Sequence, residues 1–393
     1  IGGATTSRQH TAVKIAPAYS LETVHVNDAS RAVPVLSSLL DPARRVRFAE
    51  QNRQDQTRLR ELFAQRRAKP LLSYPKAQAK QPDYRFDEET VSRPSFTGRR
   101  TLESIPLAEL CPYIDWTFFF TAWQLKGKYP AILESEKYGE AARELFAHGQ
   151  ALLDEIIDQD LLTAKAAYGI WPAARVGDDL AFFDSASRER EVARFFMLRQ
   201  QQDKGPNKPC LSLADFVAPR EAPVSDHVAA FVVTAGIGAN ALCRKYEAEH
   251  DDYHSIMVKA LADRLAEAGA EWLHERIRHE WGYEDDSLSK QELIAEDYRG
   301  IRPAFGYPAC PDHSEKRALF ALLDPSEVGV GLTESCAMTP AASVSGLCFG
   351  HPEARYFNLG RVSRAQLLSY SKRKNMALSE VERWLRPNLG YEP

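Results

Sequence analysis

The stretch that most restricts the fold of this chain lies at residues 302–308, Arg-Pro-Ala-Phe-Gly-Tyr-Pro, with Ala-Cys-Pro-Asp-His directly after it. Its prolines remove backbone donors and push the residue before each of them toward extended geometry, so the stretch cannot be regular helix or strand. Gly306 permits a turn or a close backbone approach that a side chain would block. The sequence therefore predicts a stiff loop that carries one fixed cation, Arg302, and one aromatic ring, Tyr307.

A loop of this kind suits a small zwitterionic ligand. The Arg302 guanidinium can pair with a carboxylate, free backbone groups can bind polar edges, and the Tyr307 ring can face an adenine or a cation. The alternative interpretation is a rigid connector between a helix and the next element, and the spacing leaves both open.

Composition narrows the class of protein. The chain has 393 residues, 44% of them hydrophobic and 26% charged, which is ordinary for a globular protein of two or three domains. A net charge of −4 gives no electrostatic reason to expect nucleic acid as a partner. No window approaches about eighteen apolar residues, so we expect no membrane span. A reduced, cytoplasmic protein fits the six cysteines better than a disulfide scaffold or a zinc site, because they are widely spread and include no C-x-x-C pair (Cys111, Cys210, Cys243, Cys310, Cys336 and Cys348).

The first 42 residues are typical of the tail of an α/β unit. The chain starts at Ile1 with neither an initiator Met nor a signal peptide, so we expect it to be a fragment whose upstream part is missing. A glycine turn at residues 2–3, a short helix at 11–15, a strand at 23–26 and a capped helix at 31–40 follow one another. Ligands of doubly wound sheets bind just past the carboxyl ends of strands, which is where the turns at 2–3 and 27–30 would lie.

Two further regions follow. Residues 43–85 form a charged helix (43–67) and a linker (69–85), and residues 86–393 form the largest predicted domain. Within that domain we expect helices at 134–159, from 251 past 274, and at 314–323, 364–374 and 378–385. Strands are expected at 168–173 and 180–183, joined by a hairpin turn, and at 213–219, 229–234, 333–338, 342–349 and 356–359.

Two sets of carboxylates are candidates for function. Asp115 lies among aromatic residues, and a buried carboxylate needs a partner or shifts its pKa. It can therefore bind a ligand or cap a helix that starts at Trp116. Asp263, Glu267 and Glu271 form an acidic row along the long helix, which we interpret as a solvated face.

Three motifs that imitate known sites are set aside. Gly236-Ile237-Gly238 follows an apolar strand but lacks the third glycine of a dinucleotide-binding fingerprint. His274 and His279 are five residues apart, which places them on different faces of a helix, so they cannot share one zinc ion. His250 and His254 have helical spacing but no third ligand in view. We therefore predict no metal site.

Several segments together resemble one family, in order and with similar spacing over essentially the whole chain. They are residues 1–7 with 10–15, 113–116, 250–253 with 257–267, 302–311, 343–346 and 380–391. The chain resembles the C-terminal part of cobalamin-dependent methionine synthase, that is, the end of its cobalamin-binding module and its reactivation domain. The resemblance implies an α+β fold with a twisted antiparallel sheet and flanking helices, preceded by the tail of a flavodoxin-like α/β cobalamin-binding domain.

The resemblance also implies site residues. Asp115 would bind the ammonium or a ribose hydroxyl of S-adenosylmethionine, and Arg302 would bind its carboxylate or, through the backbone, its adenine. The full set of positions carried over for S-adenosylmethionine is Asp115, Glu267, Arg302, Ala304, Gly306, Tyr307, Tyr356 and Phe357; those for cobalamin are Gly2, Gly3 and Ala29. The chain departs from the family pattern in three places, where Phe305 and Phe118 replace prolines and Phe357 replaces a tyrosine.

The function implied is reactivation. The parent methyltransferase carries a methyl group from methyltetrahydrofolate to homocysteine through cobalamin, and this segment would support the reductive methylation of cob(II)alamin by S-adenosylmethionine. The electron would come from flavodoxin or a flavoprotein reductase; most of the cobalamin site and the zinc site belong to the upstream part. We expect no protein nucleophile and no catalytic triad.

Two alternatives stay open. The first is a non-catalytic docking module for the flavoprotein, with a vestigial S-adenosylmethionine pocket. The second is an independent methyltransferase, which is disfavoured because the sequence has no glycine-rich strand-turn-helix motif of that class.

Overall fold

The computed structural model describes residues 7–26, 32–68, 70–283 and 288–393. The chain divides into two compact units, residues 1–72 and residues 73–393. Among the described residues, no helix has the length and apolar character that crossing a membrane requires.

The smaller unit is helical where it is described. It contains α1 (Arg8–His10), the π-helical turn η1 (Thr11–Ile15), η2 (Ala16–Ala18), α2 (Ala32–Leu40) and α3 (Pro42–Ala68). The predicted helices at 11–15 and 43–67 are confirmed, and the helix predicted at 31–40 is confirmed from residue 32, the first that is described there. The predicted strand at 23–26 is wrong. Side chains of α3 take the place of a neighbouring strand there, because Asn52 and Gln56 donate to the Thr23 carbonyl. The predicted cobalamin contacts Gly2, Gly3 and Ala29 lie outside the described residues.

The larger unit begins with a segment that the sequence placed in the linker. Helix α4 (Tyr74–Ala79) belongs to this unit by its contacts. The Tyr74 hydroxyl donates to Asp178 at 2.6 Å, and Asp178 lies in the turn between two strands of the sheet.

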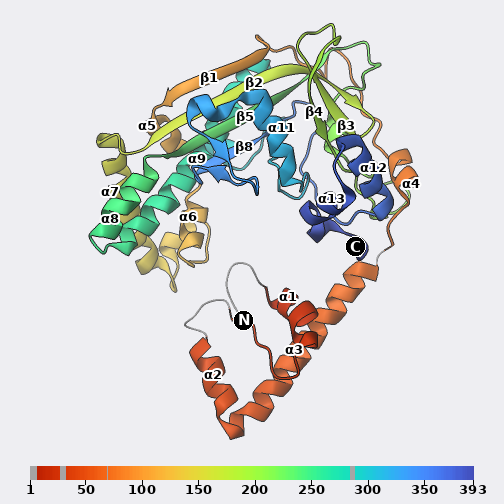
Figure 1. Ribbon diagram of the computed structural model, residues 1–393. Helices are drawn as coiled ribbons and strands as arrows, with labels where there is room; N and C mark the ends of the chain where they lie inside the picture. The colour runs from red at the N-terminus through yellow and green to blue at the C-terminus, as the bar shows by residue number, and fades with distance from the viewer. Residues whose placement is uncertain (1–6, 27–31, 69, 284–287) are drawn as a thin grey trace. The chain divides into compact units, whose positions relative to one another are not determined.

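A six-stranded antiparallel sheet forms the centre of the larger unit. Its strands are β1 (Gly98–Ile105), β2 (Thr163–Val176), β3 (Asp179–Phe183), β4 (Glu191–Phe196), β5 (Asp226–Ile237) and β8 (Ser343–Cys348). The long β2 pairs with β5 along most of its length, and on its other side with β1 in its first half and β3 in its second. Figure 1 accordingly shows β3 and β4 turned away from β1, β2 and β5. The predicted α+β fold with an antiparallel sheet and flanking helices is confirmed.

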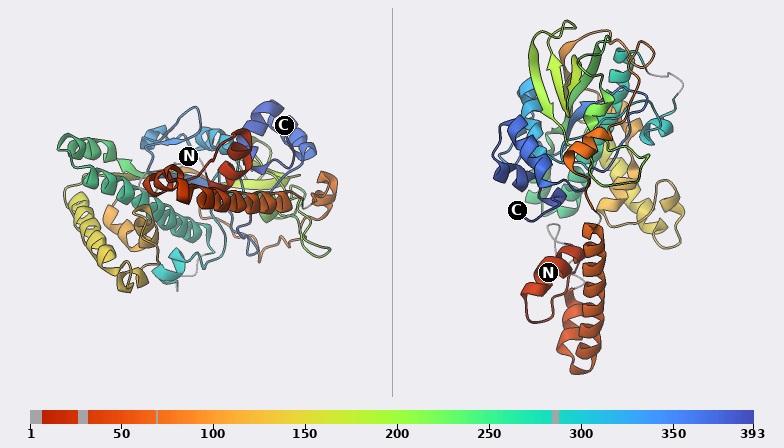
Figure 2. Two further views of the ribbon diagram at one scale, coloured as in Figure 1. Left: turned by 90° about the horizontal axis from the view of Figure 1, so that it is seen from below. Right: turned by 90° about the vertical axis from the view of Figure 1, so that its right-hand side faces the viewer.

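Both faces of the sheet are buried. Successive side chains of a strand point to opposite faces, so each strand contributes apolar residues to both. In β5, Phe231 and Val233 pack in one apolar cluster, and Val228 and Val232 pack in another on the opposite face. Figure 2 (right) shows the C-terminal helices, in blue, and the yellow to teal helices on opposite sides of the strands.

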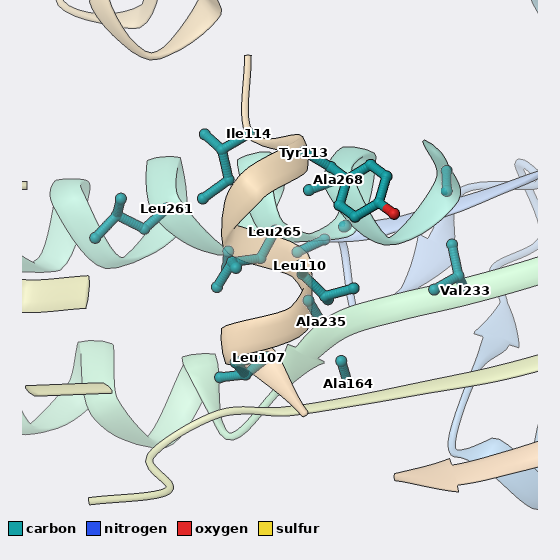
Figure 3. Packing of buried hydrophobic residues seen from close by; sticks show 14 of the residues in the cluster. Leu107, Leu110, Tyr113, Ile114, Ala164, Val233, Ala235, Leu261, Leu265 and Ala268 are labelled. Atoms are coloured by element: carbon teal, nitrogen blue, oxygen red, sulfur yellow. The ribbon is translucent and has the colours of Figure 1, made fainter. Parts of the chain in front are cut away.

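We call the face of Phe231 and Val233 the first face and that of Val228 and Val232 the second face. The first face carries α5 (Leu107–Leu110), α6 (Trp116–Ala122), α7 (Gly139–Asp158), α8 (Ala239–Ala248) and α9 (Asp252–Trp281), with α10 (Lys290–Ile294) after it. Asp251 caps the start of α9 and Gly282, at φ +83°, ends it. Leu110 and Tyr113 lie against Leu265 and Ala268 of α9 (Figure 3). This packing fixes the start of α6 beside the middle of α9.

The second face and the C-terminus carry α11 (Lys316–Leu323), α12 (Arg364–Lys374) and α13 (Leu378–Trp384), with the short strands β6 (Gly331–Leu332) and β7 (Met338–Thr339). Three predicted strands are wrong here. Residues 213–216 form a 3-10 turn in which Asp215 accepts a hydrogen bond from the Ser212 amide at 2.8 Å, and of the rest of this segment only Pro219 forms an isolated bridge, with Arg175. Residues 333–338 are mostly a turn between β6 and β7, with Cys336 at φ +59°. Residues 356–359 bond to loops and side chains instead, since the Leu359 amide donates to the Pro308 carbonyl.

A buried cluster of charges joins the far end of the sheet to the segments around it. Arg199 is fully buried and donates to Asp178 and Asp215 at 2.6–2.8 Å. Burial opposes its charge, but the bonds to Asp215 and Asp178 outweigh burial and raise the Arg199 pKa.

We predict that Arg199→Met destabilises the larger unit by about 3–5 kcal/mol, because two buried carboxylates lose their partner. Urea denaturation of both proteins measures the difference. Arg190→Met is the matched control: the Arg190 side chain is 80% exposed and 4.0 Å from Asp184, so its loss should cost at most about 1 kcal/mol. Equal effects of the two substitutions would contradict the structural role given to Arg199.

Candidate functional site

A cavity of about 750 Å³ opens beside the middle of α9. Its walls come from the start of α6, one face of α9, the chain from residue 294 to 309, β8, and the segment 356–358. The lining residues are Tyr113, Asp115, Phe118, Arg264, Glu267, Glu271, Ile294, Glu296, Arg302, Pro303, Ala304, Tyr307, Pro308, Ala309, Val344, Tyr356, Phe357 and Asn358. A volume of this size suits a ligand as large as a nucleoside with an amino-acid side arm.

The loop at 302–308 enters the cavity along the edge of β8. Ile301 exchanges two backbone hydrogen bonds with Phe349, and the Leu347 amide donates to the Pro303 carbonyl at 3.1 Å. Gly346 permits this approach, because a Cβ there would lie 2.5 Å from the Pro303 carbonyl oxygen. Extended residues alternate sides, so Ile301 packs in the core of the second face and Arg302 points to α9.

After Ala304 the chain folds into a tight turn. The Tyr307 amide donates to Ala304, the Cys310 amide to Tyr307 and the Gly306 amide to Cys310, at 2.8–3.2 Å. The Cys310 thiol also donates to the Ala304 carbonyl at 3.0 Å. Much of the backbone that the sequence left free for a ligand is therefore used inside the turn.

Gly306 and Phe305 do not line the cavity. Gly306 has φ +102°, and a Cβ would lie 2.0 Å from the His313 ring, so this glycine is required by the turn itself. Phe305 is 2% exposed and stacks on Phe195 with ring centroids 5.7 Å apart. The replacement of the family's proline by Phe305 consequently adds a side chain to the core and none to the cavity.

Arg302 is held by two carboxylates. Its Nη2 lies 2.6 Å from Glu271 Oε2 and 3.4 Å from Glu296 Oε1. Burial opposes the charge, but Glu271 outweighs it, and the Arg302 pKa is raised well above its usual value. Burial raises the pKa of Glu296, while Arg302 acts in the opposite direction. Arg302 therefore stays positively charged in the cavity wall, and Glu271 and Glu296 already neutralise part of its charge.

Aromatic rings form the rim of the cavity. Phe118, Tyr307 and Tyr356 are 58%, 59% and 44% exposed, so part of each ring is accessible to a ligand, although the Arg264 guanidinium lies over the Phe118 ring at 5.5 Å. The Tyr356 hydroxyl accepts from the Arg302 amide at 3.1 Å. Phe357 lines the cavity and also packs near Phe216, with centroids 6.5 Å apart.

Asp115 combines the two roles that the sequence left as alternatives. Its Oδ1 accepts from the Thr117 amide at 2.8 Å and so caps α6, and the residue also lines the cavity. A carboxylate accepts several hydrogen bonds, so Oδ2 can bind a ligand while Oδ1 caps the helix.

The structure brings most of the predicted residues together. Seven of the eight positions expected to bind S-adenosylmethionine line one cavity: Asp115, Glu267, Arg302, Ala304, Tyr307, Tyr356 and Phe357. The eighth, Gly306, shapes the loop beside it. Within the described ranges, no three His, Cys, Asp or Glu side chains are grouped so that they could hold a metal ion.

The interpretation of the acidic row is wrong for Glu271. Asp263 is exposed, but Glu267 lines the cavity and the Glu271 side chain is only 5% exposed. Tyr113, Glu271 and Glu296 were missed as site residues. The spacing of Glu267 and Glu271 offered a signal for one of them, because residues one helical turn apart share a face and Glu267 was already a candidate.

Two comparisons with known proteins show what this chain is similar to. The model of a protein family described as vitamin B12 dependent methionine synthase, activation domain, matches residues 106–375. The crystal structure of the MetH reactivation domain bound to AdoHcy matches this chain with a TM-score of 0.79 and 44% sequence identity. That match covers 82% of this chain and 100% of the other.

We predict that Gly306→Ala lowers the free energy of unfolding by more than Gly177→Ala does. Both glycines have positive φ, and alanine in such a conformation costs about 1–2 kcal/mol. Only at Gly306 would the new methyl group also displace a neighbour, the His313 ring, whereas a Cβ at Gly177 meets nothing within 4 Å. Urea denaturation of the two variants tests this, and equal losses would contradict the packing described for the loop.

Proposed function

Because the chain belongs to the vitamin B12-dependent methionine synthase activation-domain family, we propose that its cavity binds S-adenosylmethionine. The observation that carries the proposal is the convergence of Asp115, Glu267, Arg302, Tyr307 and Tyr356 on one cavity. The bound AdoHcy of the similar crystal structure is the demethylated form of this ligand, which supports the same assignment.

Each part of the ligand has a partner of suitable chemistry. The Arg302 guanidinium suits the carboxylate, and Asp115 Oδ2 suits the α-ammonium or a ribose hydroxyl. The open faces of Tyr307 and Tyr356 suit the adenine or the sulfonium, which is a cation that aromatic rings attract. Glu267 adds a negative charge to the wall, and this also favours a cationic ligand.

The proposed role in the enzyme is to present the methyl donor for reactivation. Cobalamin, when it is bound by the rest of the enzyme, would supply the nucleophilic cobalt that accepts the methyl group. This chain would contribute positioning: the loop and the aromatic rim would hold the sulfonium methyl group in an orientation that leaves it accessible to the methyl acceptor. The electron pair of the broken carbon–sulfur bond stays on the sulfur, which leaves S-adenosylhomocysteine in the cavity, and no protein nucleophile is required.

The wider setting is part of the proposal. The intact enzyme would be a cytoplasmic methyltransferase, and its cobalamin module would include Gly2, Gly3 and Ala29. Flavodoxin or a flavoprotein reductase would donate the electron that reactivation consumes.

The geometry weakens the alternative that this chain is a non-catalytic docking module. It rested on the Phe305 and Phe357 departures, and Phe305 points into the core. Phe357 retains a ring on the cavity wall and lacks only the hydroxyl, so the cavity remains lined at that position.

We predict that the chain binds S-adenosylmethionine saturably and that Asp115→Asn and Arg302→Ala each weaken binding about tenfold or more, measured by calorimetric titration. Asparagine is the informative change at Asp115, because it is as good a helix cap as aspartate and removes only the charge. Asp115→Ala is the comparison that also removes the cap, and it should additionally lower stability by about 1 kcal/mol. Absence of binding by the folded, unaltered chain would contradict the proposal.

A further inference from the structure

Helix α9 presents a line of polar residues to the loop. Glu267, Glu271, His274 and Arg278 follow one another at steps of four, three and four residues, which keeps them on one face. Glu267 and Glu271 line the cavity, Glu271 with little of its side chain exposed, and His274 and Arg278 are buried behind them. A buried run of charge is costly unless its members are paired, so this face has to be matched by a partner of opposite charge.

Glu271 is the centre of this line. Its Oε2 lies 2.6 Å from Arg302 Nη2 and accepts from the Tyr298 hydroxyl at 3.3 Å. Its Oε1 lies 3.9 Å from Arg278 Nη1. The Glu271 side chain is 5% exposed, so these groups, and not solvent, decide its position and that of Arg302.

The orientation of Arg302 depends on which of its nitrogens are already engaged. Nη2 serves both Glu271 and Glu296, and Nε is buried with no hydrogen-bond partner among the described residues. A guanidinium offers five N–H donors from three nitrogens in a rigid plane. Nη1 is consequently the nitrogen that remains for a ligand, and its direction is set as soon as Nη2 is fixed.

We propose that Glu271 is a positioning residue for the ligand's carboxylate. By binding Nη2, it fixes the guanidinium plane of Arg302, so that Nη1 donates into the cavity. This inference rests on the proposed function, because it assumes that the carboxylate of S-adenosylmethionine binds Arg302. Glu271 lines the cavity with only 5% of its side chain exposed, and its effect on the ligand in this arrangement is exerted through Arg302.

The alternative partner of Arg302 explains why Glu271 is required. Glu296 also contacts Nη2, at 3.4 Å, and it lines the cavity with 38% of its side chain exposed. Without the charge of Glu271, the buried guanidinium turns to Glu296, which then occupies the space of the ligand's carboxylate. The cavity would lose its donor for the carboxylate while the sites for adenine and sulfonium stay in place.

The test is calorimetric titration of the full chain with S-adenosylmethionine and with decarboxylated S-adenosylmethionine. Glu271→Gln should weaken binding of the first ligand about tenfold or more, the size of effect expected for a charge-assisted bond, and change the second less than about twofold. Arg302→Ala should show the same selectivity, and the double variant should be no weaker than Arg302→Ala. Glu280→Gln is the control. Glu280 lies on the same helix as Glu271 but does not line the cavity, and its charge pairs with Arg100 and Arg276.

A role in packing alone predicts a different result. If Glu271→Gln weakens both ligands equally, or if its effect adds to that of Arg302→Ala, the inference is wrong. Tyr298→Phe keeps the test decisive should Glu271→Gln fail to fold, because it removes one hydrogen bond to the same carboxylate and no charge. It should weaken S-adenosylmethionine alone by about two- to fivefold, and an unchanged ratio of the two affinities would overturn the inference. Binding of neither ligand by the unaltered chain would instead contradict the proposed function, and this inference with it.

Discussion

The buried ion pair between Glu271 and Arg302 is the constraint on which the site depends. A charge pair away from water is tolerated only where both partners are held in good geometry, so α9 and the loop must keep a fixed relation to each other. The sheet provides that relation: α9 packs on one face through residues such as Leu265, and the loop bonds to the edge of β8. The cavity lies where these two attachments leave a gap that the apolar core does not fill.

The loop at 302–308 and the residue before it send some side chains into the cavity and others into the apolar core. Ile301 packs in the core and its neighbour Arg302 lines the cavity, and where the turn begins after Ala304, Phe305 stacks on Phe195 in the core. Gly306 then turns the chain so that Tyr307 returns to the rim. A short, proline-rich segment can serve both purposes because its prolines and its internal hydrogen bonds fix the direction of each side chain.

Local patterns predicted the long helices and the hairpin of β2 and β3, and the family resemblance predicted seven of the 18 residues that line the cavity. The local patterns failed at residues 23–26, where side chains from a distant part of the chain, Asn52 and Gln56, bond to the backbone. They also failed at residues 213–216, where the bond from the Ser212 amide to Asp215 closes a 3-10 turn within an apolar run. They also missed β1, whose charged residues form a partly exposed edge. The burial of Glu271 could not be predicted, because an acidic row on a helix has the same spacing whether it meets solvent or a buried arginine.

A crystal structure of the chain grown with S-adenosylmethionine tests the central claim most directly. The account predicts that the ligand occupies the cavity beside α9, with its carboxylate within hydrogen-bond distance of Arg302 and its sulfonium methyl directed outward past Tyr307 and Tyr356. A ligand bound elsewhere on the chain, or in this cavity with its carboxylate away from Arg302 while Glu271 and Arg302 keep their pairing, would contradict it.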